Sequence, residues 1–141
     1  MRQDSTSIGF EWPLRIYFED TDAGGIVYHA NYLKFMERAR TEWLRNLGYE
    51  QNDLASEFRI AFVVSKIAID YLIPARFNDS IVVCSRVERL KRMSIEFEQN
   101  VKSSDQTLTR ARVKVGCIDT QSYRPREIPQ KIYQEIGNAG G

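Results

Sequence analysis

Residues 31–47, NYLKFMERARTEWLRNL, carry the strongest periodic signal in the chain. Apolar side chains recur there with the i, i+3, i+4, i+7 spacing of one helix face, and they are Tyr32, Phe35, Met36, Ala39, Trp43, Leu44 and Leu47. Gly48 follows, and glycine commonly ends a helix because it adopts the left-handed conformation without strain. The pattern predicts an amphipathic helix about 25 Å long, enough to cross a whole sheet.

Alternating apolar and polar residues, typical of half-buried strands, occupy much of the remaining chain. One run precedes the helix and carries Leu14, Ile16 and Phe18, and four follow it, at residues 63–72, 80–90, 94–102 and 107–119. Short connections between the later runs favour antiparallel pairing. Since a single sheet must bury its apolar face on the helix, the sequence predicts an α+β fold. In it, a curved antiparallel β-sheet of about five strands wraps around one long central α-helix.

Length and composition indicate one globular domain spanning residues 1–141, with flexible ends expected at residues 1–11 and 137–141. Twenty basic and nineteen acidic side chains leave no global field that would recruit nucleic acid. No signal peptide and no transmembrane segment is apparent, so a reducing cytosol is the expected location. Because one helix cannot cover both faces of a sheet, we expect the chain to form oligomers.

Several kinds of catalytic site do not fit the sequence. Cys84 and Cys117 lie in apolar, strand-like runs and lack the CxxC or Cys/His spacing of a zinc site. A single histidine and two isolated cysteines do not make a catalytic metal centre, and no GxSxG elbow of a serine hydrolase is present. We therefore expect neither a metal ion nor another cofactor.

The segment DTDAGGIVYHANY, residues 20–32, holds two aspartates, a Gly-Gly pair and the only histidine. It leads into the predicted helix, whose first N–H groups have no internal acceptors and attract negative charge. Gly24 and Gly25 allow a sharp turn and close approach of a ligand. The Asp22 carboxylate would then lie near whatever those N–H groups hold, as in an acyl-transfer site. A polar turn that merely satisfies loop N–H groups fits the same residues.

Three motifs at matching separations resemble the 4-hydroxybenzoyl-CoA thioesterase family of hotdog enzymes. They are D-T-D-A-G-G-x-V-Y-H-x-x-Y, E-R-A-R-T-E and Y-x-x-P-A-R, and the likeness extends from Trp12 to about Tyr133. The chain is most similar to the acyl-CoA thioesterase branch that is associated with the Tol-Pal system and lipid metabolism. The resemblance implies a hotdog fold and hydrolysis of acyl-CoA thioesters to a free acid and coenzyme A.

The resemblance also implies roles for individual residues. Asp22 matches the catalytic carboxylate, and His29 supplies the backbone N–H that polarises the thioester carbonyl as well as an active-site imidazole. An ordinary aspartate is anionic but a weak base at neutral pH. Direct attack on the carbonyl and activation of a water molecule therefore both stay open. Asp20 is left with a structural role.

The resemblance and the charge pattern together suggest where coenzyme A binds. A cationic cluster lies in RVERLKRMS, residues 86–94, where Lys91 and Arg92 match phosphate-binding residues of related thioesterases, and Arg126 resembles another. Such cations suit phosphate because they form charge-assisted hydrogen bonds, although a solvated hairpin tip explains them equally well. The remaining expected substrate-binding residues are Gly24, Gly25, Tyr28, Tyr32 and Ser65.

Two alternative functions fit parts of the sequence. The Tol-Pal association also suits a binding module for acyl carrier protein or an envelope complex, peripheral to the inner membrane, with little or no turnover. A hotdog enoyl-CoA hydratase would show a tighter D-x(4)-H spacing, whereas Asp22 and His29 are seven positions apart. The resemblance further implies a homo-oligomer, dimer or tetramer, with acyl-CoA bound across the dimer interface and acyl carrier protein as a further partner.

Overall fold

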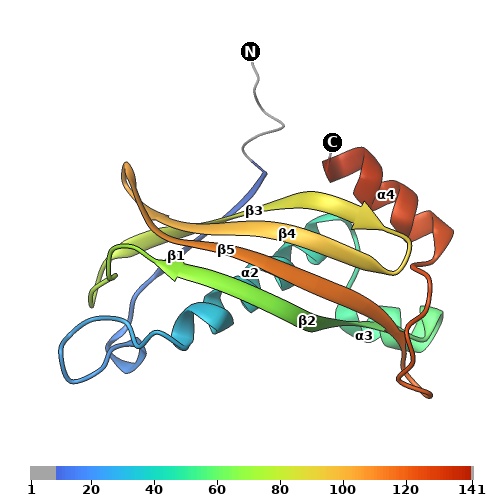
Figure 1. The fold of residues 1–141 in the computed structure, drawn as a ribbon, viewed down its shortest axis with the longest axis horizontal. Helices are drawn as coiled ribbons and strands as arrows, with labels where there is room; N and C mark the ends of the chain where they lie inside the picture. The colour runs from blue at the N-terminus through green and yellow to red at the C-terminus, as the bar shows by residue number, and fades with distance from the viewer. Residues whose placement is uncertain (1–8, 141) are drawn as a thin grey trace, which may run out of the picture.

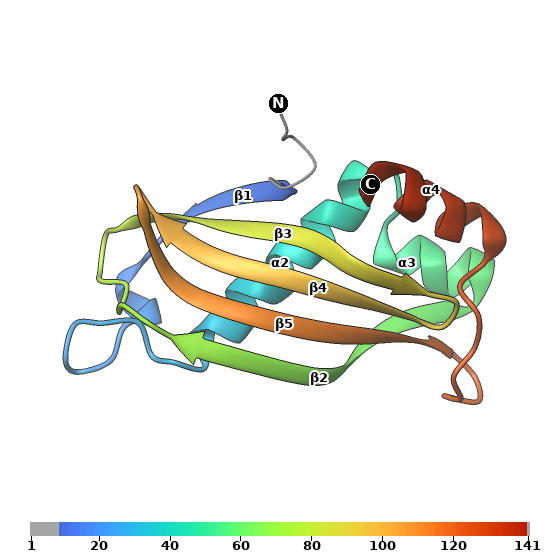
Figure 2. The same ribbon diagram turned by 45° about the horizontal axis from the view of Figure 1, so that its top comes forward.

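The computed structural model describes residues 9–140, which form one five-stranded antiparallel sheet with helices beside it (Figures 1 and 2). In spatial order β1-β3-β4-β5-β2, the strands are β1 (Phe10–Arg15), β3 (Ser80–Lys91), β4 (Ser94–Ser103), β5 (Gln106–Asp119) and β2 (Ile60–Tyr71). The helices are α2 (Asn31–Asn46), α3 (Gln51–Asp53) and α4 (Gln130–Gly140). The α+β class and the antiparallel sheet of five strands are confirmed. No helix within residues 9–140 is long and apolar enough to cross a membrane.

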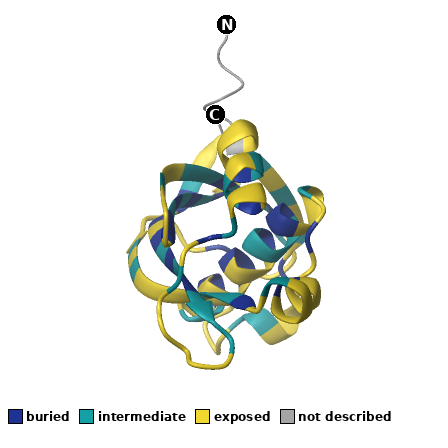
Figure 3. Ribbon diagram, turned by 90° about the vertical axis from the view of Figure 1, so that its right-hand side faces the viewer, coloured by how far each residue is buried: buried dark blue, intermediate teal, exposed yellow. Residues whose placement is uncertain are grey.

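Helix α2 packs its apolar side against the inner face of the sheet, so that buried residues gather between the two (Figure 3). The Trp43 and Phe97 rings meet edge to face with their centroids 5.0 Å apart. The helix ends at Asn46, and Gly48 has a φ of +100°, the left-handed conformation expected of a glycine there. Of the seven predicted apolar positions, those buried are Tyr32, Phe35, Met36, Ala39, Trp43 and Leu44. Burial of each large side chain contributes about 1.5–3 kcal/mol to stability.

Helical structure that the sequence pattern did not predict occurs at two places besides α2. Residues 51–58 form α3 and a π-helical turn, and α4 buries Ile132 and Ile136. The hydroxyl of Tyr49 donates a hydrogen bond to Glu135 of α4, and burial together with this carboxylate raises the pKa of Tyr49 to about 12. Two isoleucines are too few for the periodicity to reveal α4 in the sequence.

The chain ends and the first strand also differ from the expected boundaries. Strand β1 includes Phe10, and α4 continues to Gly140, so regular structure enters both segments predicted to be flexible. Residues 1–8 and 141 lie outside the described part. The first strand ends at Arg15, whereas the alternation suggested that it continues past Phe18, which is 78% exposed. The chain turns here because the Tyr17 N–H donates to the Asp20 carboxylate at 2.8 Å, within a 3-10 turn, Phe18–Asp20.

Strand β2 lies at one edge of the sheet and pairs only with β5 in the described chain. It begins at Ile60 rather than residue 63, and a bulge separates Val64 from Lys66. Val63 and Val64 are 40% and 45% exposed. An edge strand presents N–H and C=O groups that can pair with another strand. The exposed valines and the open edge therefore mark β2 as a surface suited to a further chain.

Candidate functional site

Residues 21–30, which lie between the 3-10 turn and α2, form a loop held against the chain that follows β2. Thr21 pairs with Val27 across the base of the loop, and Ile26 pairs with Arg76. These pairings place the residues on either side of the loop next to each other. The Thr21–Val27 pairing therefore brings residues near positions 22 and 28 close together in space.

Asp22 is exposed and begins a turn of this loop, in which the Gly25 N–H donates to the Asp22 carbonyl at 3.0 Å. Its Oδ1 accepts a hydrogen bond from the Gly24 N–H at 2.8 Å, and its backbone N–H donates to the Ile26 carbonyl at 2.9 Å. Within residues 9–140, its second carboxylate oxygen has no hydrogen-bond partner. The side chain thus behaves as a turn-forming aspartate through one oxygen and leaves the other available to a ligand.

The two glycines suit the turn for different reasons. Gly25 has a φ of +79°, which side-chain-bearing residues adopt with strain, and no atom lies within 4 Å of where its Cβ would be. A Cβ at Gly24 would lie only 3.3 Å from Asp22 Oδ1 and would press on the carboxylate. Glycine at both positions therefore preserves the carboxylate's position and leaves open space beside it.

His29 lies in the turn just ahead of α2, where Ala30 is the N-cap. The first helical N–H groups donate to the carbonyls of residues 28–30 and are already paired. In the described chain, the backbone N–H groups of His29 and Ala30 have no acceptor. The available donors therefore precede the helix, which refines the expectation that its first turn supplies them. They lie at the positive end of the helix dipole, where negative charge is stabilised.

Aromatic side chains surround the His29 imidazole. The Tyr28 ring centroid lies 4.7 Å away, and the Tyr71 ring lies edge-on at 6.1 Å. The Tyr71 hydroxyl donates to the His29 carbonyl at 3.1 Å, which ties the end of β2 to this turn. A pocket of about 170 Å³ adjoins the imidazole, and its lining residues are Ile26, Val27, His29, Tyr32, Tyr71, Leu72, Ile73 and Pro74.

Tyr32 is buried, and its hydroxyl accepts a hydrogen bond from the Ala75 N–H at 3.1 Å. Burial raises the pKa of Tyr32, so the phenol stays neutral at physiological pH. Its ring also borders the pocket beside His29. Tyr28, in contrast, is 49% exposed. Of the two predicted substrate-binding tyrosines, Tyr32 is built into the wall and Tyr28 lies on the surface.

Asp20 differs from Asp22 in what it binds. Its carboxylate accepts from the Tyr17 N–H, and its backbone carbonyl accepts from the Tyr28 N–H at 3.1 Å and from the Asn31 side-chain amide at 2.9 Å. Asp20 therefore links the 3-10 turn to the start of α2. These bonds fit the structural role expected for it.

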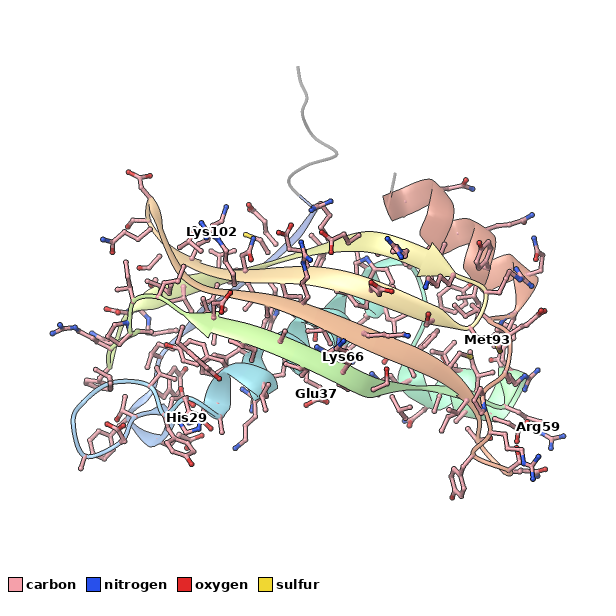
Figure 4. The ribbon with its side chains drawn as sticks, viewed as in Figure 1. His29, Glu37, Arg59, Lys66, Met93 and Lys102 are labelled. Atoms are coloured by element: carbon pink, nitrogen blue, oxygen red, sulfur yellow. The ribbon has the colours of Figure 1, made fainter. Side chains whose placement is uncertain are left out.

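Lys91 and Arg92 lie at the β3–β4 turn, next to Met93 and at the opposite end of the sheet from His29 (Figure 4). The Lys91 ammonium is 3.9 Å from the Glu96 carboxylate. Arg92 donates to Glu127 at 3.0 Å, and its guanidinium lies 4.6 Å from the centre of the Tyr133 ring. Both predicted phosphate ligands thus have protein partners, and Arg92 connects the turn to α4.

Arg126 and Ser65 also contact the protein itself. Arg126 donates to the Phe58 carbonyl at 2.9 Å and lies 3.6 Å from the Asp119 carboxylate. The Ser65 hydroxyl donates to the Lys114 carbonyl at 3.3 Å, beside the bulge of β2. Neither residue lies beside the pocket at His29. A chain on its own therefore does not gather all the predicted site residues into one place.

A second pocket, of about 140 Å³, lies between α2 and the inner face of the sheet. Arg40 lines it and donates through Nη1 to the Oε1 of fully buried Gln99 at 2.8 Å. The sequence reasoning missed this arginine because charged helix residues are usually solvated. Its spacing from Met36 and Trp43 places it on the apolar side of the helix, and this was the available signal.

In the part of the chain that the structure describes, no group of three or more His, Cys, Asp or Glu side chains could hold a metal ion. The chemistry available around residues 21–30 comes from a carboxylate, an imidazole and unpaired backbone donors, among them the N–H groups of His29 and Ala30. This combination can stabilise an oxyanion and supply a nucleophile or base.

Comparisons with protein families, with known proteins and with solved structures all indicate the same family. The family described as Thioesterase-like superfamily matches residues 16–136. The chain is 46% identical over 124 residues to Acyl-CoA thioesterase YbgC of Haemophilus influenzae, covering 88% of this chain and 91% of that protein. Identity to Acyl-CoA thioester hydrolase YbgC of Escherichia coli O6:H1 is 43% over 128 residues, covering 90% and 95%. The crystal structure of "Probable Thioesterase" from Bartonella henselae superposes with a TM-score of 0.81 and 34% identity, covering 84% and 98%.

Proposed function

The chain belongs to the thioesterase-like superfamily, and we propose that it is an acyl-CoA thioesterase in which Asp22 is the catalytic carboxylate. The activity is supported by two relatives that are named as acyl-CoA thioesterases or thioester hydrolases. They are 46% and 43% identical to this chain, and each match covers nearly the whole length of both proteins. The observation that carries the assignment of the site is the loop ahead of α2. There, a carboxylate with one unpaired oxygen and the unpaired N–H of His29 occur together.

In the proposed reaction, the thioester carbonyl oxygen accepts a hydrogen bond from the His29 N–H. One route is attack by Asp22 on the carbonyl carbon, which releases coenzyme A as a thiolate and leaves a mixed anhydride that water hydrolyses. In the other, Asp22 takes a proton from the water that attacks. Both routes yield a free acid and coenzyme A. The backbone donor stabilises the oxyanion in either case, an effect worth about 10²–10³-fold in rate.

The proposal is tested by measuring thiol release from a panel of acyl-CoA esters of different chain lengths. Hydrolysis of at least one ester is expected, and acyl carrier protein thioesters form a second set in the same assay. Absence of thiol release from every ester would overturn the proposed activity and favour a binding module. Chain-length profiles would at the same time identify the preferred acyl group.

We further propose that two copies join through their β2 edges to complete the site. His29 contacts Tyr71 at the end of β2, whereas Lys91, Arg92 and Arg126 lie near its beginning. Antiparallel pairing of two β2 edges would place the end of one strand beside the beginning of the other. Each loop of residues 21–30 would then face the basic residues of the second copy. The molecular mass in solution should equal two or four chains, and a single-chain mass would contradict this arrangement.

The imidazole of His29 can be separated from its backbone N–H by His29→Ala. We expect kcat to fall at least about tenfold, because the side chain orients Asp22 or the attacking water. Lys34→Ala, on an exposed residue of the first turn of α2, is the control and should leave kcat near the native value. If His29→Ala hydrolyses acyl-CoA at the native rate, only the backbone of residue 29 takes part.

The role of the basic turn is tested by replacing Lys91 and Arg92 with glutamine. If they bind phosphate, the double variant should raise the KM for acyl-CoA and flatten its dependence on salt. Because Arg92 also pairs with Glu127, Glu127→Gln serves as the control. It removes the pair but keeps the cation, so KM should not rise. An unchanged KM in the double variant would remove both residues from the site.

A further inference from the structure

The pocket between α2 and the sheet has apolar walls and a polar side. Its apolar lining comes from Trp43, Leu44, Phe62, Val64, Ile95, Phe97 and Val115, and its polar lining from Glu37, Arg40 and Gln51. Its volume of about 140 Å³ is close to that of a cavity that holds a benzene-sized ligand, roughly 150 Å³. It is therefore large enough for the end of an acyl group.

Arg40 is held at the pocket by a buried network. Gln99, fully buried, accepts from Arg40 at 2.8 Å and donates to the Met36 carbonyl at 3.0 Å and to the Ser85 hydroxyl at 2.8 Å. These three bonds fix the Gln99 amide, which in turn fixes the guanidinium. A guanidinium has five N–H donors, and within residues 9–140 only the bond to Gln99 engages them.

Arg40 is half-buried, so donors of its guanidinium that lack a protein partner favour a ligand oxygen that accepts from them. Burial lowers the pKa of Arg40, but arginine remains charged because its ordinary pKa is so high. Glu37 lies one turn earlier on α2, borders the same pocket and favours the charged form of Arg40. With this carboxylate at the exposed rim, a neutral oxygen is better suited to the pocket than a second carboxylate would be.

We propose that this pocket receives the far end of the acyl group and that Arg40 selects groups ending in a neutral acceptor oxygen, a hydroxyl or a carbonyl. The inference rests on the proposed thioesterase function and names its substrate class. A hydroxyl or carbonyl oxygen accepts from the guanidinium, whereas a methyl end leaves those donors unpaired. Arg40 is nine residues beyond Asn31, the first residue of α2, which is about 14 Å along the helix axis.

The position of the pocket fits a site shared between two copies. Phe62 and Val64 line it from the first half of β2, while His29 of the same chain contacts the far end of that strand. Glu37 lies between these ends in Figure 4. In the proposed antiparallel dimer, the pocket would open toward the loop of residues 21–30 of the second copy. A short acyl group held there would then reach Arg40.

The test uses pairs of acyl-CoA esters of equal length, from butanoyl to octanoyl, that end in either a methyl or a hydroxymethyl group. The native protein should favour the hydroxyl-ended ester at one or more lengths by about tenfold in kcat/KM. Arg40→Met keeps the apolar stem but removes the donors, so the preference should disappear. Arg40→Lys should keep part of it. Arg38→Met, on an exposed arginine of the same helix, should leave the preference unchanged.

The outcomes distinguish this inference from the function on which it rests. Equal or lower kcat/KM for the hydroxyl-ended ester at every length, measured on the native protein, overturns the role of the pocket but leaves a thioesterase. An undiminished preference in Arg40→Met overturns the role of Arg40. If the Arg40→Met variant does not fold, the role of Arg40 is judged from the preference of the native protein and from its partial retention in Arg40→Lys. Absence of hydrolysis of all esters refutes the proposed activity itself.

Discussion

Asp22→Asn should lower kcat for acyl-CoA hydrolysis by about a thousandfold while leaving substrate affinity nearly native. Asparagine has the same shape, and its side-chain oxygen can still accept from the Gly24 N–H that Asp22 Oδ1 holds at 2.8 Å. The loop should therefore keep its conformation. An amide neither attacks the thioester as a carboxylate does nor takes a proton from water, so both proposed routes would be blocked.

This variant is measured by thiol release for turnover and by calorimetry with a non-hydrolysable thioether analogue for binding. Asp20→Asn is the control, because it makes the same chemical change two positions away. It weakens the hydrogen bond to the Tyr17 N–H and should cost about 1 kcal/mol of stability, with kcat near native. A near-native kcat in the Asp22→Asn variant would show that Asp22 is not the catalytic carboxylate.

The two routes open to Asp22 are separated by a single turnover of the native protein in ¹⁸O-labelled water. If a mixed anhydride forms and water attacks its acyl carbon, the label enters the acid and Asp22 keeps both of its unlabelled oxygens, as it also does when Asp22 acts as a base. If water attacks the aspartyl carbon, the label appears in Asp22. Labelled Asp22 would establish covalent catalysis. If water attacks the acyl carbon instead, an acyl-enzyme trapped by rapid acid quench would establish it.

Gln99→Leu should lower the free energy of unfolding by about 3 kcal/mol. Gln99 is fully buried and is bonded to Arg40, Met36 and Ser85. Leucine is similar in size but would leave a half-buried guanidinium and a buried serine hydroxyl without this partner, and each polar group left unsatisfied inside the protein costs about 1–3 kcal/mol. The loss should appear as a lower urea midpoint with an unchanged slope.

Asn100→Leu is the matched control on the opposite face of β4. Its buried Oδ1 has no hydrogen-bond partner in the described chain, so little stability should be lost. A double variant, Gln99→Leu with Arg40→Met, removes the unpaired donors and should lose less than the sum of the single changes. Equal loss of unfolding free energy in Gln99→Leu and Asn100→Leu would show that the hydrogen bonds of Gln99 do not stabilise the fold.

The elements predicted best from the sequence are those whose signal is local. The apolar spacing of residues 31–47 predicted α2 to within one residue at its end, and alternation predicted the four later strands closely. Both patterns follow from backbone geometry, in which side chains repeat every 3.6 or every two residues. The loop of residues 21–30 was likewise recognisable, because its aspartates, glycines and histidine are adjacent in the chain.

Contacts between distant segments explain what the sequence analysis missed. Helix α4 carries only two inward isoleucines and acquires its place by packing near β3, with Glu135 bonded to Tyr49. The pairing of Arg92 with Glu127 depends on where that helix docks. The alternation of apolar residues continues to Phe18, but the strand stops at Arg15 because the Asp20 side chain accepts from the Tyr17 N–H and closes a turn there.

Neighbouring residues encode the α+β class, the helix, the strands and the candidate catalytic loop, so each of these could be predicted from the amino-acid sequence. Contacts between distant segments hold Arg40 in its network with Gln99 and place the basic residues at the opposite end of the sheet from His29. The partners and burial of a long side chain depend on which distant segments meet around it. No periodicity along the chain records that.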